Sequence, residues 1–117
     1  MKQEIEIKVE SHGIVTLFDI KGDVTIFSEP FLKEAYKNAN DKGTKKLLLK
    51  FEENAYINSG GIAVLIQLLA KTKQNNQQIG ITGLSEHFKK IFHMVGITKF
   101  AHIHNTMEEA VENLSQS

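Results

Sequence analysis

Apolar and polar residues change their spacing several times along the chain, and each spacing predicts a different element. Residues 4–10 alternate strictly between charged and β-branched side chains, the pattern of a half-exposed strand at a sheet edge. Residues 14–20 are more apolar and predict a more central strand. The turn Ser11-His12-Gly13 is all that separates the two, so we expect the strands to be antiparallel.

Helical and strand patterns alternate through the remainder of the chain. Pro30 and a possible N-cap at Ser28 open a helix whose apolar stripe runs from Phe31 to Ala39. A capping box at residues 106–109 opens the last helix. The other predicted elements are strands at 47–51, 79–82 and 101–104 and helices at 59–75 and 84–95.

The order of these elements predicts the fold class. Strands separated by helices are joined by right-handed parallel crossovers. We therefore expect an α/β domain with a mixed, mostly parallel sheet, an N-terminal antiparallel hairpin and about four helices. The 117 residues suit one domain spanning 1–117, with residues 115–117 as a disordered tail.

Composition narrows the classes of function. The 14 acidic residues balance 14 basic ones, and every basic residue is lysine. Without net charge or a guanidinium group, direct recognition of nucleic acid is disfavoured. Cysteine is absent, which excludes disulfides, thiolate metal sites and a cysteine nucleophile. No signal peptide or apolar run of about 20 residues occurs, so we expect a cytoplasmic protein without a membrane span.

The most unusual segment opens the helix predicted at 59–75. Asn58 and Ser59 are both good N-caps, yet Gly60 and Gly61 follow, each costing about 1 kcal/mol relative to alanine in a helix interior. One explanation is a close approach of backbone, from the sheet or from a partner. The helix start also suits an anion. The alternative is that Ser59 is only a cap and the glycines only allow tight packing.

Other candidate sites are weaker. His102 and His104 alternate on a short strand, but further metal ligands are not evident, so we expect them to face solvent and no metal to bind. Glu52 and Glu53 are adjacent on an extended segment and so point to opposite faces. Neither a Gly-x-Ser-x-Gly motif nor a Walker phosphate loop is present. We therefore expect neither enzymatic activity nor a bound cofactor.

Four segments together resemble one family. Residues 56–65, Tyr-Ile-Asn-Ser-Gly-Gly-Ile-Ala-Val-Leu, are similar to the signature of STAS domains, the anti-sigma-factor antagonists. Residues 21–24 stand where that family has a Gly-Glu-Leu-Asp turn. Residues 89–97 resemble its basic, apolar helix ending in Gly-Leu, and residues 106–114 its closing helix. The predicted order of strands and helices is also that of the family.

The resemblance implies a phosphorylation switch at Ser59. In the family, the unphosphorylated antagonist binds an anti-sigma factor that is also a serine kinase, and a phosphatase reverses the modification. The expected partner surface comprises Asn58, Ser59, Gly60, Gly61, Asp23, Thr25 and, as an apolar rim, Met94. This chain has Asn58 for the family's aspartate, and Thr25 where a second acid usually lies.

Two further interpretations remain open at this point. The domain could dock constitutively, as a STAS subunit of a transporter or of a stress-signalling scaffold, without phosphorylation. Alternatively, the glycine-flanked helix start could bind a nucleotide or a lipid. Constitutive docking involves a different protein partner from the switch. Nucleotide or lipid binding involves a small molecule in place of a protein.

Overall fold

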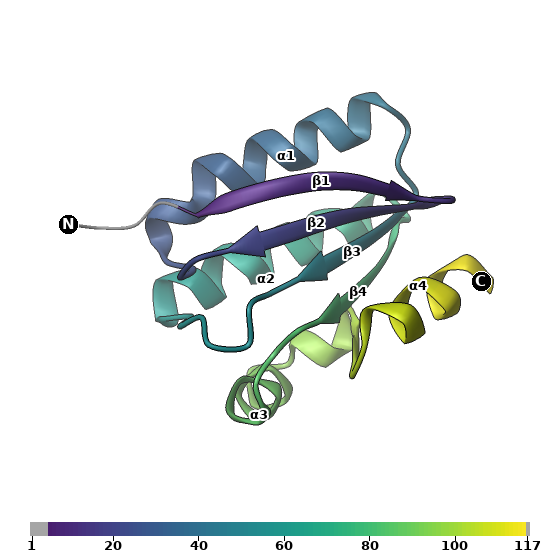
Figure 1. Ribbon diagram of the computed structural model, residues 1–117. Helices are drawn as coiled ribbons and strands as arrows, with labels where there is room; N and C mark the ends of the chain where they lie inside the picture. The colour runs from purple at the N-terminus through teal and green to yellow at the C-terminus, as the bar shows by residue number, and fades with distance from the viewer. Residues whose placement is uncertain (1–4, 117) are drawn as a thin grey trace.

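The computed structural model describes residues 5–116, which fold into one five-stranded sheet in the order β1-β2-β3-β4-β5 (Figure 1). β1 and β2 are antiparallel and the other neighbours are parallel, as the sequence predicts. The elements are β1 (Glu6–His12), β2 (Val15–Lys21), η1 (Ile26–Ser28), α1 (Glu29–Asp41), β3 (Lys46–Lys50), α2 (Ser59–Gln74), β4 (Gln78–Thr82), α3 (Glu86–Met94), η2 (Ile97–Lys99), β5 (His102–His104) and α4 (Met107–Gln116).

The hairpin turn lies two residues later than its composition predicts. β1 continues through Ser11 to His12, which pairs with Val15. Gly13 supplies the positive φ (63°) that a two-residue hairpin loop with glycine at its first position needs. Ile14 follows it in the turn and is 62% exposed, so the expectation that this residue begins the second strand is wrong.

Helix boundaries agree with the sequence to within two residues, and three local features differ. Ser28 does not cap α1 through its side chain; its hydroxyl accepts a hydrogen bond from the Thr25 amide within the η1 turn. The 3-10 turns η1 and η2 were not predicted, because three residues show no periodicity. Ser115 and Gln116 are helical rather than a frayed tail, and Ser117 lies outside the described residues.

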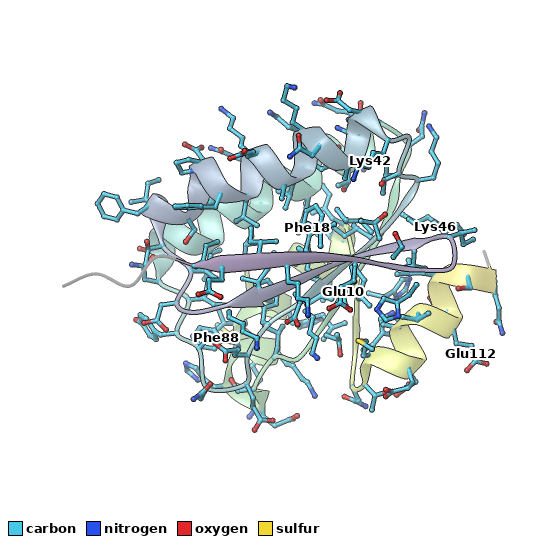
Figure 2. The ribbon with its side chains drawn as sticks, turned by 45° about the horizontal axis from the view of Figure 1, so that its top comes forward. Glu10, Phe18, Lys42, Lys46, Phe88 and Glu112 are labelled. Atoms are coloured by element: carbon cyan, nitrogen blue, oxygen red, sulfur yellow. The ribbon has the colours of Figure 1, made fainter. Side chains whose placement is uncertain are left out.

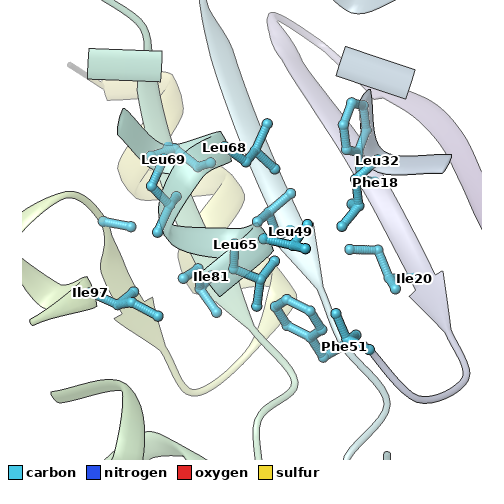
Figure 3. Packing of buried hydrophobic residues seen from close by; sticks show 14 of the residues in the cluster. Phe18, Ile20, Leu32, Leu49, Phe51, Leu65, Leu68, Leu69, Ile81 and Ile97 are labelled. Carbon is cyan, nitrogen blue, oxygen red and sulfur yellow. The ribbon is translucent and has the colours of Figure 1, made fainter. Parts of the chain in front are cut away.

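The sheet separates two apolar clusters. The larger one lies between the sheet and α1, α2 and α3, and includes Phe18, Leu49 and Leu65 (Figure 3). The smaller one lies under α4 and consists of Val15, Leu17, Leu48, Ala110 and Leu114. The central β3 is therefore buried on both faces, which explains its continuous apolar run. No helix within residues 5–116 has the length and apolar character to span a membrane.

Two loops are joined at one end of the sheet by a short parallel bridge between Val24 and Ile57. The Val24 amide donates to the Tyr56 carbonyl at 2.9 Å, and the Asn58 amide donates to the Val24 carbonyl at 3.2 Å. These bonds hold the segment before η1 against the start of α2. The two segments are distant in sequence but form one unit.

Gly61 is required by this junction. A Cβ atom at Gly61 would lie 2.1 Å from the Val24 carbonyl oxygen, far inside van der Waals contact. Close backbone approach, one of the explanations that the sequence left open, therefore accounts for Gly61, and the approaching backbone is that of the loop residue Val24 rather than of a strand or a partner. Gly60 is less constrained, because its Cβ would lie 3.2 Å from the Ile26 Cβ and amide nitrogen.

His104 on β5 departs from the expected solvent-facing position. It is half-buried against Gly80, where a Cβ atom would lie 3.4 Å from both the His104 ring and a Leu114 methyl group. Its Nε2 atom is buried and has no hydrogen-bond partner in the described part of the chain. Burial lowers the pKa of His104, the charge of His102 lowers it further, and Glu109 opposes the shift. His102 is exposed, as expected.

The buried His104 predicts acid sensitivity of the fold. Because its pKa is lower in the folded state than in the unfolded state, the unfolded chain binds more protons below about pH 6.5. The free energy of unfolding should therefore fall as the pH drops from about 7.5 to 5.5, and should fall less in His104→Leu. Urea denaturation at the two pH values measures this. His87→Leu, which removes an exposed histidine, is the control; an unchanged pH dependence in His104→Leu would refute the role of burial.

The contact at Gly61 predicts an asymmetric effect of two alanines. Gly61→Ala should lower the free energy of unfolding by about 2 kcal/mol or more, because the added methyl group must displace the Val24 backbone. Gly60→Ala is the matched control and should change it by less than about 1 kcal/mol, since its neighbour can move by a few tenths of an ångström and alanine favours the helix. Chemical denaturation compares them. Equal effects of the two substitutions would contradict the junction.

Candidate partner-binding site

The candidate site is the N-terminus of α2. Asn58 is the N-cap: its backbone is extended, and its Oδ1 accepts a hydrogen bond from the Gly61 amide at 2.9 Å. Ser59 therefore becomes the first residue of the helix, and it is exposed. Within residues 5–116 its hydroxyl group has no hydrogen-bond partner. The interpretation that Ser59 serves only as a cap is wrong, because Asn58 has that role.

The electrostatics of this helix start favour added negative charge. The positive end of the helix dipole lies at Ser59, and the first turn of α2 has no acidic residue. Asn58 caps the helix without a carboxylate, so its own side chain adds no negative charge beside Ser59. A phosphate on the Ser59 hydroxyl would be stabilised by the dipole and by unsatisfied amide groups.

The structure brings Asp23 and Thr25 to the same place, where each supports a loop. Asp23 Oδ1 accepts a hydrogen bond from the Tyr56 amide at 2.9 Å. Thr25 Oγ1 accepts from the Phe27 amide at 3.1 Å and thereby caps η1. Both side chains thus shape the surface beside Ser59 through internal bonds. Thr25 caps η1 with a hydroxyl group, at a position where an acidic residue is usual in the family.

Exposed apolar side chains lie on the two segments that meet at the helix start, and two of them, Ile26 and Phe27, were not predicted from the sequence. Ile26 lies directly against Gly60 and is 53% exposed, Phe27 is 61% exposed, and Tyr56 is 60% exposed. Here Ile26, Phe27, Tyr56 and Ser59 are called the helix-start surface. Two adjacent apolar residues outside any periodic pattern were the signal for Ile26 and Phe27. Exposed apolar side chains gathered beside polar groups are typical of an interaction surface.

The predicted contribution of Met94 stays a prediction. Met94 is the last residue of α3 and is 81% exposed. α3 meets the helix-start surface nearer its other end, where the Phe88 and Tyr56 rings stand edge to face with centroids 5.9 Å apart. The helical spacing of Phe88, Phe92 and Val95 predicts a place in the core for all three; Phe88 and Phe92 are buried, whereas Val95 is exposed and the prediction is wrong for it.

A groove of about 830 Å³ lies at the carboxyl ends of the parallel strands, between Lys21, Lys50 and the start of α3. Three of its charged residues, Glu52, Glu86 and Lys89, take part in internal hydrogen bonds. Glu52 accepts from the Gly22 amide at 2.8 Å, and Lys89 contacts both Glu86 and Asn105 at 2.8 Å. Hydrogen bonding to Lys89 lowers the pKa of Glu86. In the described part of the chain, no three His, Asp or Glu side chains are placed to hold a metal ion.

Comparison with known proteins finds similar sequences and similar folds. A curated relative, the anti-sigma-B factor antagonist of Staphylococcus aureus strain NCTC 8325, is 21% identical over 106 residues, covering 89% of this chain and 98% of the relative. An anti-sigma factor antagonist from Mycobacterium paratuberculosis has a similar structure, with a TM-score of 0.80, 18% identity and coverage of 98% and 99% of the two chains.

A third similar structure is that of the Bacillus cell fate determinant SpoIIAA in the phosphorylated form. Its TM-score is 0.65 at 13% identity, and the match covers 92% of this chain and 98% of that one. The family model of the STAS domain matches residues 6–110, nearly the whole of the chain. On this match, and on the fold that it shares with anti-sigma factor antagonists, the chain belongs to the STAS domain family.

Proposed function

We propose that this protein is an anti-sigma-factor antagonist that binds a kinase-type anti-sigma factor through its helix-start surface, and that phosphorylation of Ser59 ends the binding. The observation that carries the proposal is the position of Ser59. Its side chain is exposed at a helix N-terminus beside the exposed Ile26, and its hydroxyl group has no hydrogen-bond partner within residues 5–116. The names of the curated relatives, anti-sigma-B factor antagonists, support the same role.

The proposed modification is a transfer of the γ-phosphoryl group of ATP, held by the partner, to the Ser59 oxygen. The hydroxyl proton leaves to a base on the partner, and ADP is released. A free hydroxyl favours this reaction, because no internal hydrogen bond has to break first. A phosphatase would hydrolyse the phosphate and restore the hydroxyl group. The similar SpoIIAA structure, solved in a phosphorylated form, is compatible with a fold that tolerates such a group.

Phosphorylation would affect the partner more than the domain itself. A phosphate adds about −1.5 to −2 charges, which the α2 dipole stabilises within the domain. A partner packed on Ile26, Phe27 and Tyr56 would instead have to desolvate a dianion at the centre of the contact. A loss of about 3 kcal/mol would weaken binding roughly a hundredfold. The chain has no arginine to clamp the phosphate, so helix amides or lysines would hold it.

This function places the protein in the cytoplasm with its partner and requires no contact with DNA. The neutral net charge and absence of arginine agree with that role. A constitutive docking role is the second candidate, favoured by the specific replacement of the family's acids by Asn58 and Thr25. The two candidates differ in whether negative charge at Ser59 alters binding.

A binding experiment with two substitutions separates them. The wild-type protein is used as bait in an extract of its source organism, and the captured protein is identified and purified. Ser59→Ala should bind it about as well as wild type, whereas Ser59→Asp should bind at least about tenfold more weakly, because a carboxylate stands in for part of the phosphate charge. Ser115→Asp, on an exposed serine of α4, is the control for added charge.

The kinase reaction is tested with the same partner. Incubation with radiolabelled ATP should label wild type and leave Ser59→Ala unlabelled. Equal binding of the partner by wild type and Ser59→Asp, together with no label on wild type, would contradict the phosphorylation switch and favour constitutive docking.

A further inference from the structure

β1 forms an open edge of the sheet. Its seven residues pair with β2 on one side, and within residues 5–116 no strand pairs with the other side (Figure 1). Alternate residues of an edge strand direct unpaired amide and carbonyl groups outward, where another strand can bind them. β5, at the opposite edge, has only three residues and offers a much shorter template.

The side chains of β1 have a distinctive order of charges. Glu6, Lys8, Glu10 and His12 share one face of the sheet. Glu10, labelled in Figure 2, and His12 pair with Leu17 and Val15, which pack under α4, so this is the face that α4 also occupies. Within one copy, Glu10 contacts both Lys8 at 3.5 Å and His12 at 3.1 Å. On the other face, Val9 is 51% exposed. The edge therefore combines alternating charge with an exposed apolar residue at the strand centre.

We propose that two copies of this chain associate by antiparallel pairing of their β1 strands about a two-fold axis at Val9. In this register Val9 lies opposite Val9 of the second copy. Lys8 lies opposite Glu10, and Glu6 opposite His12, and symmetry repeats each pair. This is the antiparallel register in which all seven residues of β1 pair with the same seven residues. The strand is thus complementary to itself over its full length.

Neighbouring registers lack that complementarity. A shift of two residues in one direction places Lys8 opposite Lys8 and Glu6 opposite Glu10. A shift of two residues in the other direction places Glu10 opposite Glu10. Like charges directly opposite across an antiparallel pair are destabilising, whereas opposite charges and apolar pairs are stabilising. The charge order of β1 therefore selects the register that also forms the most backbone hydrogen bonds.

The dimer would be weak and reversible. An interface built on one pair of strands falls below about 1,200 Å² of buried surface, the range of transient association. Exposed Lys8 also raises the cost of bringing a wrong strand to this edge. We therefore expect a concentration-dependent equilibrium between monomer and dimer. The dimer contact does not use the helix-start surface.

Cross-linking tests the register, because the chain has no cysteine of its own. In Val9→Cys the two Cα atoms should lie about 4.5–5.5 Å apart, within the range of a disulfide. In Ser11→Cys they should lie about 13 Å apart, because Ser11 faces Ile7 of the second copy. Mild oxidation followed by non-reducing electrophoresis should therefore cross-link Val9→Cys and not Ser11→Cys. Equal cross-linking of both variants would overturn the proposed register.

Charge exchange tests the pairing in solution by sedimentation velocity over a series of concentrations. Lys8→Glu should weaken the dimer at least about tenfold, because it creates two like-charge pairs with Glu10. The double variant Lys8→Glu/Glu10→Lys should restore association, since both pairs regain opposite charge. Lys90→Glu, on the exposed face of α3, is the control and should associate like wild type. A wild-type protein that stays monomeric at every concentration, or a double variant no better than Lys8→Glu, would contradict the proposal.

Discussion

The contact between the Val24 carbonyl group and the backbone of Gly61 is the constraint on which the rest of the site depends. It allows the loop before η1 to lie directly on the first turn of α2, where a Cβ atom would lie 2.1 Å from the oxygen. Hydrogen bonds from Val24 to Tyr56 and from Asn58 to Val24 then join the two loops. Ile26 is placed beside Gly60 as a consequence, and the helix-start surface forms from segments that are distant in sequence.

This arrangement allows one helix start to serve both the stability of the fold and the proposed regulation. The Asn58 side chain accepts a hydrogen bond from the Gly61 amide and fixes the helix boundary. The Ser59 hydroxyl group therefore makes no capping bond within residues 5–116. A negative charge added at Ser59 would be stabilised by the α2 dipole within the domain. A partner would instead find that charge beside the exposed apolar side chains of Ile26, Phe27 and Tyr56. The proposed switch therefore requires no conformational change: the surface is preformed, and the phosphate alters what can pack on it.

Much of the fold could be predicted because it rests on periodicity. Alternation predicted the edge strand, helical spacing predicted the helices, and their order predicted the parallel crossovers. The candidate site could be picked out because Asn58, Ser59, Gly60 and Gly61 form a contiguous motif. What the motif could not supply was the neighbour of Gly61, since nothing local to that residue indicates Val24. Likewise, Ile26 and Phe27 lie in a 3-10 turn, which has no repeat to detect, and Ile14 was assigned to a strand because it is apolar.

Native-state amide hydrogen exchange tests most directly whether the helix-start surface is preformed. The amide groups of Val24 and Asn58 form the two bonds of the junction, although both lie outside the regular strands and helices of the domain. If the junction is an integral part of the fold, their opening free energies should approach those of the central β3 amides, which report global unfolding. Exchange of Val24 and Asn58 at the rates of the exposed loop at residues 52–54 would show instead that the junction opens independently, and would contradict the account.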